Sequence, residues 1–350
     1  MKNKIIALII ALVVIAAAVV LIVTNGNKVN NAAAKPTDAP AATEAATEAP
    51  TTEAATEPAT EAATEPATEA PTTEAATEPA TEAPAEPEPA AKGLKIAVPN
   101  DPTNEARALR ILEANGLLKI REDAGITATK NDITENPLNI EIVEVEAAMV
   151  PNVLPDVDYA VINSNYAIEA GLKPAKDALI IEGEYSTHNN ILCVKEGNED
   201  KPETKALIAA LSSRKVADFI TETYEGSVIS VVTEPGDGFD PELDYAALKG
   251  ATISVAASPT PHAEVLKVAA EILAEKEITL NVIEYADYVQ PNMVVDSGEV
   301  FANYFQHTPY LINFNQEQGT HVVSVLEIHV EPMGLYGGQQ QDLNALNLAK

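Results

Sequence analysis

The stretch TISVAASPTPHAEVLKVAAEILAEKEITLNVIEY, residues 252–285, contains the pattern that decides the fold. Thr252 to Ala256 and Leu280 to Tyr285 are short runs rich in β-branched and aromatic residues, which is typical of strands. Between them, residues 262–275 carry apolar side chains at the three- and four-residue spacing of an amphipathic helix. A strand, a helix and a second strand in this order predict a parallel pair with the helix packed on one face.

The same alternation covers the chain after Lys92. It predicts a mainly parallel α/β fold, with enough elements for two sheets of about 130 residues each. Thr233 to Gly250 interrupts the pattern with Pro and Gly residues, so we interpret it as a connector. The remaining predicted strands are Leu94–Val98, Ile140–Glu146, Tyr159–Asn163, Asn190–Val194 and His321–Val330, and the remaining predicted helices are 103–116 and 203–224.

Composition excludes several functional classes. The formal net charge is -31, from 53 acidic against 22 basic residues, which argues against nucleic acid as a partner because such binding depends on Lys and Arg. The single cysteine, Cys193, permits neither an internal disulfide nor a cysteine-based metal site. No nucleophile elbow, phosphate loop, dinucleotide fingerprint or HExxH helix occurs, so we expect no enzyme and no cofactor. The five His residues leave zinc as an alternative, but their spacing matches no common ligand set.

The N-terminus predicts a membrane anchor. Lys2 and Lys4 precede an uncharged apolar run from Ile5 to Val23, which as a helix spans about 28 Å of hydrocarbon. We therefore expect residues 1–27 to form an uncleaved transmembrane helix, with a cleaved signal peptide as the alternative. The flanking lysines place the N-terminus in the cytoplasm, so the rest of a single-pass protein would lie outside the cell membrane. No cysteine lies near the run to carry a lipid.

Residues 28–92 predict a disordered tether. They consist almost entirely of Ala, Thr, Glu and Pro, with the unit TEAATEPA repeated. Glutamates four residues apart repel each other on a helix, and the repeated prolines interrupt it. The segment offers almost no large apolar side chain to bury. Glycosylation of its threonines and an adhesive role for the repeat stay open.

Three segments follow or lie between predicted strands, where open α/β sheets bind ligands. In 98–107, Asp101, Thr103 or Asn104 could cap a helix that carries Arg107 in its first turns. A cation near a helix start needs an acid such as Glu105 or an anionic ligand. The second segment is 258–266. The third, 301–314, gathers aromatic side chains around His307 and forms either a small core or a ligand cage.

At these segments the sequence resembles the methionine-binding lipoproteins of the MetQ/NlpA type, the substrate-binding components of methionine ABC importers. Several long strings carry the resemblance, which covers essentially all of 93–232 and 251–350. They are VPNDPTNEAR (98–107), VIN (161–163), GLKPAKD (171–177), ASPTPHAE (257–264), DYVQPN (287–292), ANYFQHTPYL (302–311) and EPMGLY (331–336).

The order of these strings is reversed relative to the family, which resembles a circular permutation. The family's C-terminal half stands at 94–232 and its N-terminal half at 251–336, joined through the permutation linker 233–250. The resemblance implies a two-lobe periplasmic-binding-protein-like fold of type II, with a first lobe at 93–183 and a second lobe at 184–336. We expect the tail, 337–350, to return to the first lobe and lie beside Lys92.

The resemblance also implies the ligand contacts. Arg107 would pair with the ligand carboxylate, and His307 would donate a second hydrogen bond to it. Asn163 and Asn190 would accept hydrogen bonds from the ammonium group. The aromatic side chains that would enclose the thioether are Tyr288, Phe305 and Tyr310. The alternatives are ordinary packing for the aromatics and a surface salt bridge for Arg107.

The resemblance therefore implies a monomeric solute-binding protein that captures L- or D-methionine by hinge closure and delivers it to an importer permease and ATPase. The sequence departs from the family at His188, where the family more often has an aromatic residue. This difference could alter which amino acid or methionine derivative is preferred. A tethered sensor or adhesin that uses the same binding module is the alternative.

Overall fold

The computed structural model describes residues 93–183 and 188–348. The expected anchor, 1–27, and tether, 28–92, lie outside these described residues. Within the described part, no helix combines the length and the apolarity that crossing a membrane requires.

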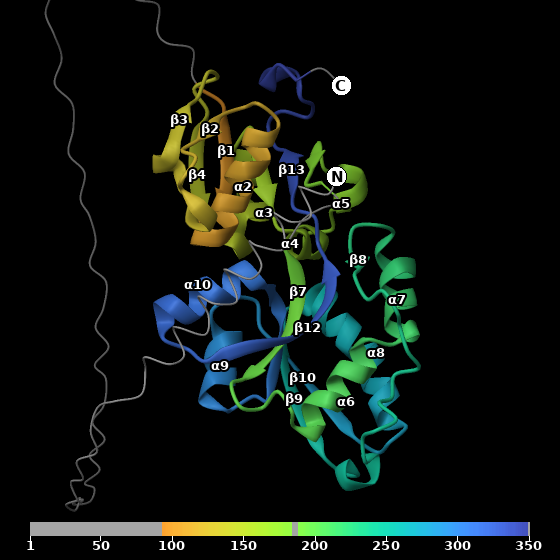
Figure 1. The fold of residues 1–350 in the computed structure, drawn as a ribbon. Coiled ribbons are helices and arrows are strands. Elements are labelled where there is room, and N and C mark those ends of the chain that lie inside the picture. The colour runs from red at the N-terminus through yellow and green to blue at the C-terminus, as the bar shows by residue number, and fades with distance from the viewer. Residues whose placement is uncertain (1–92, 184–187, 349–350) are drawn as a thin grey trace, which may run out of the picture. The chain divides into compact units, whose positions relative to one another are not determined.

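The first lobe is built on a five-stranded sheet with the order β4-β1-β5-β13-β6 (Figure 1). The chain's β1 pairs in parallel with β4 and β5, whereas β13 runs antiparallel to β5 and β6. The strands are β1 (Lys95–Pro99), β4 (Glu141–Val145), β5 (Tyr159–Ile162), β6 (Ile180–Ile181) and β13 (Gly334–Gly337), and β2 (Lys119–Ile120) and β3 (Ile133–Glu135) form a separate small ladder.

The second lobe contains a six-stranded sheet with the order β10-β9-β11-β7-β12-β8. The predicted pair at 252–285 is confirmed: β9 and β10 are parallel, with Thr252 opposite Thr279. The strands are β7 (Asn189–Lys195), β8 (Ile229–Ser230), β9 (Thr252–Ala257), β10 (Thr279–Glu284), β11 (Ala302–His307) and β12 (Val322–Val330).

Both sheets are mixed, so the prediction of mainly parallel sheets is wrong. In each sheet the first four strands of the order follow one plan: three parallel strands, then an antiparallel strand that arrives from the other lobe. That strand is β13 in the first lobe and β7 in the second. The parallel strands end where the lobes meet, whereas a strand crossing from the other lobe begins there, so it must run in the opposite direction.

Helices cover both faces of each sheet. The predicted helix 203–224 is two helices, α6 and α7, separated at Ser212 and Ser213, because the Ser213 hydroxyl accepts a hydrogen bond from the Val216 backbone N–H (3.2 Å) and caps α7. The α-helices are α2 (Pro102–Ala114), α3 (Val150–Val153), α4 (Ser164–Glu169), α5 (Pro174–Asp177), α6 (Pro202–Leu211), α7 (Arg214–Tyr224), α8 (Glu264–Ala274), α9 (Gln290–Ser297) and α10 (Thr308–Gln318).

Two sequence boundaries need correction. The aromatic segment 301–314 is not a loop: its first half is the buried strand β11 and its second half begins α10. Polar residues inside β11, such as Asn303 and Gln306, concealed the strand, because they hydrogen-bond to one another and to Asn292 rather than to water. The lobe boundary also lies before Gly334 rather than after Tyr336, since β13 belongs to the first lobe's sheet.

The C-terminal tail packs on the first lobe. Leu343 and Leu346 are buried in the same apolar cluster as Ile96 and Leu109. The Tyr159 hydroxyl donates a hydrogen bond to the backbone carbonyl of Asp342 (2.6 Å). Lys92, beside which the tail was expected, lies outside the described residues.

Candidate functional site

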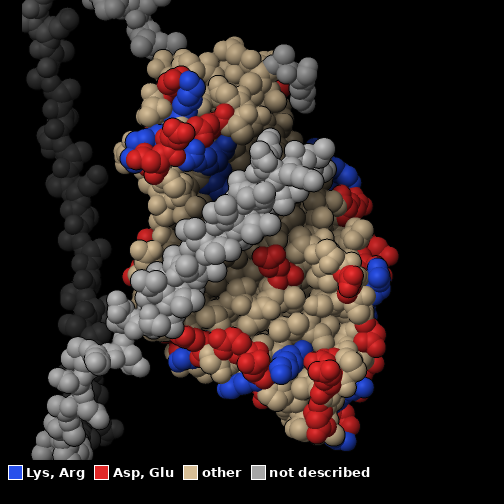
Figure 2. Space-filling model, in the orientation of Figure 1, with Lys and Arg blue, Asp and Glu red and all other residues tan. Residues whose placement is uncertain are grey.

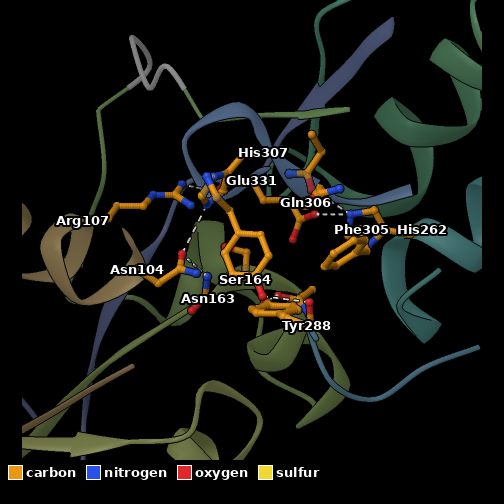
Figure 3. A pocket seen from close by; sticks show the side chains of 13 residues that line it. Asn104, Arg107, Asn163, Ser164, His262, Tyr288, Phe305, Gln306, His307 and Glu331 are labelled. Carbon is orange, nitrogen blue, oxygen red and sulfur yellow. Dashed lines mark hydrogen bonds and ion pairs between the residues drawn. The ribbon is translucent and has the colours of Figure 1, made fainter. Parts of the chain in front are cut away.

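A buried pocket lies where the two lobes meet, and all seven sequence-predicted site residues line it (Figure 3). Its space is about 350 Å³ including the opening to solvent, but only about 20 Å³ admits the centre of a water-sized sphere. That corresponds to roughly one or two water molecules. An amino-acid ligand therefore requires side chains or lobes to move. The lining residues are Asn104, Arg107, Asn163, Ser164, Asn165, Asn190, His262, Tyr288, Phe305, Gln306, His307, Tyr310 and Glu331.

Arg107 provides the positive charge of the pocket. Its Nε donates to both carboxylate oxygens of Glu182 (3.1 Å each), and its Nη2 donates to Glu182 Oε2 (2.5 Å) and to the Glu331 carbonyl (2.8 Å). Burial would raise the pKa of Glu182, but Arg107 and His188 hold it well below its usual range. The salt-bridge alternative for Arg107 is thus realised, but with Glu182 rather than Glu105, and with a side chain only 4% exposed.

Asn104, on the first turn of α2, links the two lobes. Its amide group donates to both oxygens of Asp101 (3.0 Å each), which also caps the helix by accepting from the Asn104 backbone N–H (3.0 Å). Its carbonyl oxygen accepts from Asn163 Nδ2 (2.9 Å) and lies 3.3 Å from His307 Nε2 of the second lobe. Asp101, one of the three predicted caps, is confirmed.

His307 ends β11 and caps α10. Its Nδ1 accepts a hydrogen bond from the Tyr310 backbone N–H (3.2 Å), which assigns the proton of the neutral ring to Nε2. Burial, followed by the charge of Arg107, lowers the pKa of His307 well below its usual value. The imidazole is therefore neutral at physiological pH, and its Nε2–H faces the pocket as a donor.

Tyr288, Phe305 and Tyr310 form the apolar wall. Their ring centroids lie 5.9–6.0 Å apart in all three pairs, and Phe314 stacks on Tyr310 from behind. The two hydroxyls donate to Asn165 Oδ1 (2.7 Å, from Tyr288) and to the Tyr288 carbonyl (2.8 Å, from Tyr310). The rings pack on one another and also line the pocket, so the packing alternative is realised and the ligand cage stays a prediction.

A hydrogen-bonded cluster of His262, His329 and Glu331 lies against the pocket. Glu331 Oε1 is 2.8 Å from His329 Nε2 and 3.3 Å from His262 Nε2, and His262 Nε2 is 2.8 Å from Asn190 Oδ1. The His329 Nδ1 bonds to the Tyr304 hydroxyl. These three side chains could offer metal ligands within 4.8 Å of one another. However, the same nitrogens have protein acceptors, so hydrogen bonding alone accounts for the arrangement.

The sequence interpretation missed several lining residues. Asn165 and Ser164 directly follow Asn163, and Gln306 lies between Phe305 and His307, so proximity to predicted residues could have indicated them. His262 and Glu331 lie in the strings 257–264 and 331–336, which could have indicated them singly. That they meet follows only from the pairing of the second-lobe sheet. Three buried polar atoms of the lining residues, Asn163 Oδ1, Asn165 Nδ2 and His262 Nδ1, have no hydrogen-bond partner among the described residues.

Curated relatives each match part of this chain. The chain is 44% identical over 138 residues to "Membrane lipoprotein TpN32" of Treponema pallidum, covering 39% of this chain and 52% of that protein. It is 38% identical over 139 residues to "D-methionine-binding lipoprotein MetQ" of Escherichia coli K12, covering 39% and 51%. The chain thus spans about half the length of the curated relatives it matches.

Solved structures show a similar coverage. A nutrient-binding protein from Burkholderia cenocepacia bound to methionine is 45% identical and covers 39% of this chain and 58% of that chain, with a TM-score of 0.39. A lipoprotein from Ruminococcus gnavus is 52% identical with the same coverage and TM-score.

The family comparison covers more of the chain. The model of the NlpA lipoproteins matches residues 89–232 and 253–349, which together include most of both lobes and leave out the connector. This is well over half of the chain. The protein therefore belongs to the NlpA lipoprotein family.

Proposed function

We propose that this protein is an extracytoplasmic solute-binding protein that captures methionine, or a close derivative, for an ABC importer. One observation carries the proposal: a buried pocket between two lobes combines a guanidinium, several side-chain amides and an aromatic wall. These groups suit the carboxylate, the ammonium group and the thioether of one small zwitterion. The names of relatives such as the Escherichia coli D-methionine-binding lipoprotein support the same ligand.

Each side chain has a proposed role. Arg107 and His307 bind the ligand carboxylate, and Asn163 and Asn190 accept from its ammonium group. The unpartnered Asn163 Oδ1 supports this role, since a buried acceptor without a partner is costly. The thioether is expected to lie against Tyr288, Phe305 and Tyr310, where sulfur–aromatic contacts contribute about 0.3–1.5 kcal/mol each.

Binding would proceed by hinge closure in a fold of the type II binding-protein kind. The nearly filled pocket supports this mechanism, because a ligand enters only if the lobes or side chains separate. Within residues 93–183 and 188–348, the chain passes between the lobes twice, between β6 and β7 and between β12 and β13, so few backbone dihedrals need to change.

We further propose that the chain is a circular permutant of its family. An alignment that keeps chain order can match only one half at a time, which accounts for relatives that each cover 39% of this chain although the family model matches both halves. The tail supports the proposal, since Leu343 and Leu346 pack in the first-lobe core with residues of β1. A circular permutant is expected to place its new C-terminal segment beside its new N-terminal strand in this way.

Residues 1–27 are proposed as the membrane anchor and 28–92 as a tether that holds the binding lobes outside the cell membrane. The pairing of the lobes within one chain supports a monomer as the functional unit.

The test is native mass spectrometry and thermal denaturation of the full-length protein purified in detergent. A co-purified mass equal to methionine, and a melting temperature raised by millimolar methionine but not by alanine, are expected. The absence of both with every sulfur-containing amino acid would contradict the proposal.

A further inference from the structure

Glu331 brings a second carboxylate to the pocket, which the roles proposed above do not use. It follows β12 at the point where the chain leaves the second lobe, and only 5% of it is exposed. Its side chain is among those that surround the pocket, and its carboxylate is directed toward His262 (Figure 3). Its backbone carbonyl accepts from Arg107 Nη2, so the residue is held beside the group proposed to bind the ligand carboxylate.

A hydrogen bond from His329 fixes one oxygen of Glu331. Oε1 is 2.8 Å from His329 Nε2 and 3.3 Å from His262 Nε2. Burial lowers the pKa of both imidazoles to about 3, so both rings are neutral and add no positive charge. His329 donates to Glu331, whereas His262 Nε2 donates to Asn190 Oδ1. The imidazoles therefore orient the carboxylate without bringing a cation to it. Burial raises the pKa of Glu331, and the nearby charge of Arg107 only partly opposes this, so a cation bound in the pocket would favour its ionised form.

The charges around the pocket are unequal. Arg107 is the one Lys or Arg side chain among the described lining residues, and its Nε and Nη2 are directed to Glu182. Among the described residues, no Lys or Arg forms a salt bridge with the Glu331 carboxylate, although the charge of Arg107 acts on it from a distance. Burying a carboxylate without a cation is costly, and such groups usually meet a positive charge.

We propose that Glu331 pairs with the α-ammonium group of the ligand and thereby makes the pocket selective for a free α-amino group. This inference rests on the proposed function and specifies its ligand class: the amino acid itself rather than its 2-oxo acid or an N-acyl derivative. The ammonium group has three donors, and Glu331, Asn163 Oδ1 and Asn190 Oδ1 supply acceptors of the kind it requires.

The experiment compares two ligands that differ in the amino group alone. Calorimetric titration of the full-length protein in detergent uses L-methionine and 4-methylthio-2-oxobutanoate, which keeps the carboxylate and the thioether. The wild type should bind methionine at least 10-fold more tightly. Glu331→Gln should weaken methionine binding about 10- to 100-fold, the range for losing one charge-assisted hydrogen bond, and change oxo-acid binding by less than about threefold.

Glu182→Gln is the matched control, because Glu182 is the other buried carboxylate but lies against Arg107. It should alter the affinities of both ligands together and leave their ratio within about threefold of the wild type. A ratio that collapses in Glu182→Gln and persists in Glu331→Gln would overturn the inference.

Two further outcomes are decisive. If the wild type binds the oxo acid as tightly as methionine, the selectivity claim is wrong whatever the variants do. If it binds neither ligand, the proposed function itself fails. Should Glu331→Gln not fold, Glu331→Asp replaces it: retraction of the charge should reduce the ratio, and an unchanged ratio would contradict the role of Glu331. If neither variant folds, the wild-type ratio decides.

Discussion

The ion pair between Arg107 and Glu182 yields the sharpest prediction for stability and binding together. Both side chains are largely buried, with 4% and 14% exposed, and two nitrogens of the guanidinium contact the carboxylate. Removing one partner of such a pair costs about 3–5 kcal/mol, because the other charge stays buried without compensation. Arg107→Met, which keeps much of the apolar stem, should therefore destabilise the protein by about this amount.

The double variant Arg107→Met/Glu182→Gln separates charge from packing. Because it removes both charges, we expect it to recover more than half of the stability that Arg107→Met loses. At about 2–4 °C per kcal/mol, the single variant should melt roughly 6–20 °C below the wild type and the double variant at most about half as far below it. Differential scanning calorimetry of the full-length protein in detergent measures this.

Ligand affinity distinguishes a binding role for Arg107 from a structural one. Methionine binding should be lost in both variants that lack Arg107, even where stability is recovered. In Glu182→Gln it should strengthen, because the guanidinium no longer has an internal carboxylate to satisfy it. Equal methionine affinity in the wild type and the stable double variant would refute the reasoning, as would a double variant no more stable than Arg107→Met.

Three further predictions concern the tail, a helix cap and the pH dependence. Leu346→Ala should lower the free energy of unfolding by about 2–5 kcal/mol in urea denaturation, since Leu346 is only 1% exposed in the first-lobe core; a change below about 0.5 kcal/mol would show that the tail is not part of that core. Asp101→Ala and Ser213→Ala each remove a helix cap and should each lower the free energy of unfolding by about 0.5–2 kcal/mol. Only Asp101→Ala should also weaken methionine binding in calorimetry, because the Asn104 side chain loses its hydrogen-bond acceptor. Equal affinities in the two variants would contradict this. Burial lowers the pKa of His262 and His329 from 6.5 to about 3, so the unfolded chain binds more protons below pH 6.5 and stability should fall as the pH decreases from 7.5 to 5.5; a melting temperature that is unchanged or higher at pH 5.5 would contradict this.

Local patterns in the sequence predicted the positions of β1, β4, β5, β7, β9, β10 and β12, but missed β11 and the shorter strands and did not give every direction. The helical spacing between Thr252 and Tyr285 predicted a parallel pair, which the structure confirms. The position of β7 was predicted but its antiparallel direction was not, and β13 was not predicted, because both strands cross between the lobes and no local pattern records such a crossing.

On the face shown in Figure 2, acidic and basic side chains are interspersed over the described surface, and no continuous basic patch forms there.

The site shows a similar division. Arg107 and His307 were identified from strings that resemble a family, and the structure brings both to one pocket. The partner of Arg107 was not predicted: Glu182 lies 75 residues away in sequence. Likewise, Glu331 meets His262 only because β12 and β9 belong to one sheet. Contacts that sheet order creates between distant residues can be found only in the folded structure. Individual site residues within a few positions of a recognised string can be identified from the sequence.

Isothermal titration of the full-length protein with L- and D-methionine tests the central proposal most directly. We predict saturable binding of at least one isomer with one site per chain and a negative heat-capacity change from burial of the thioether, with the heat lost in Arg107→Met. No heat from either isomer with the folded wild type, at any temperature between 10 and 35 °C, would contradict the account.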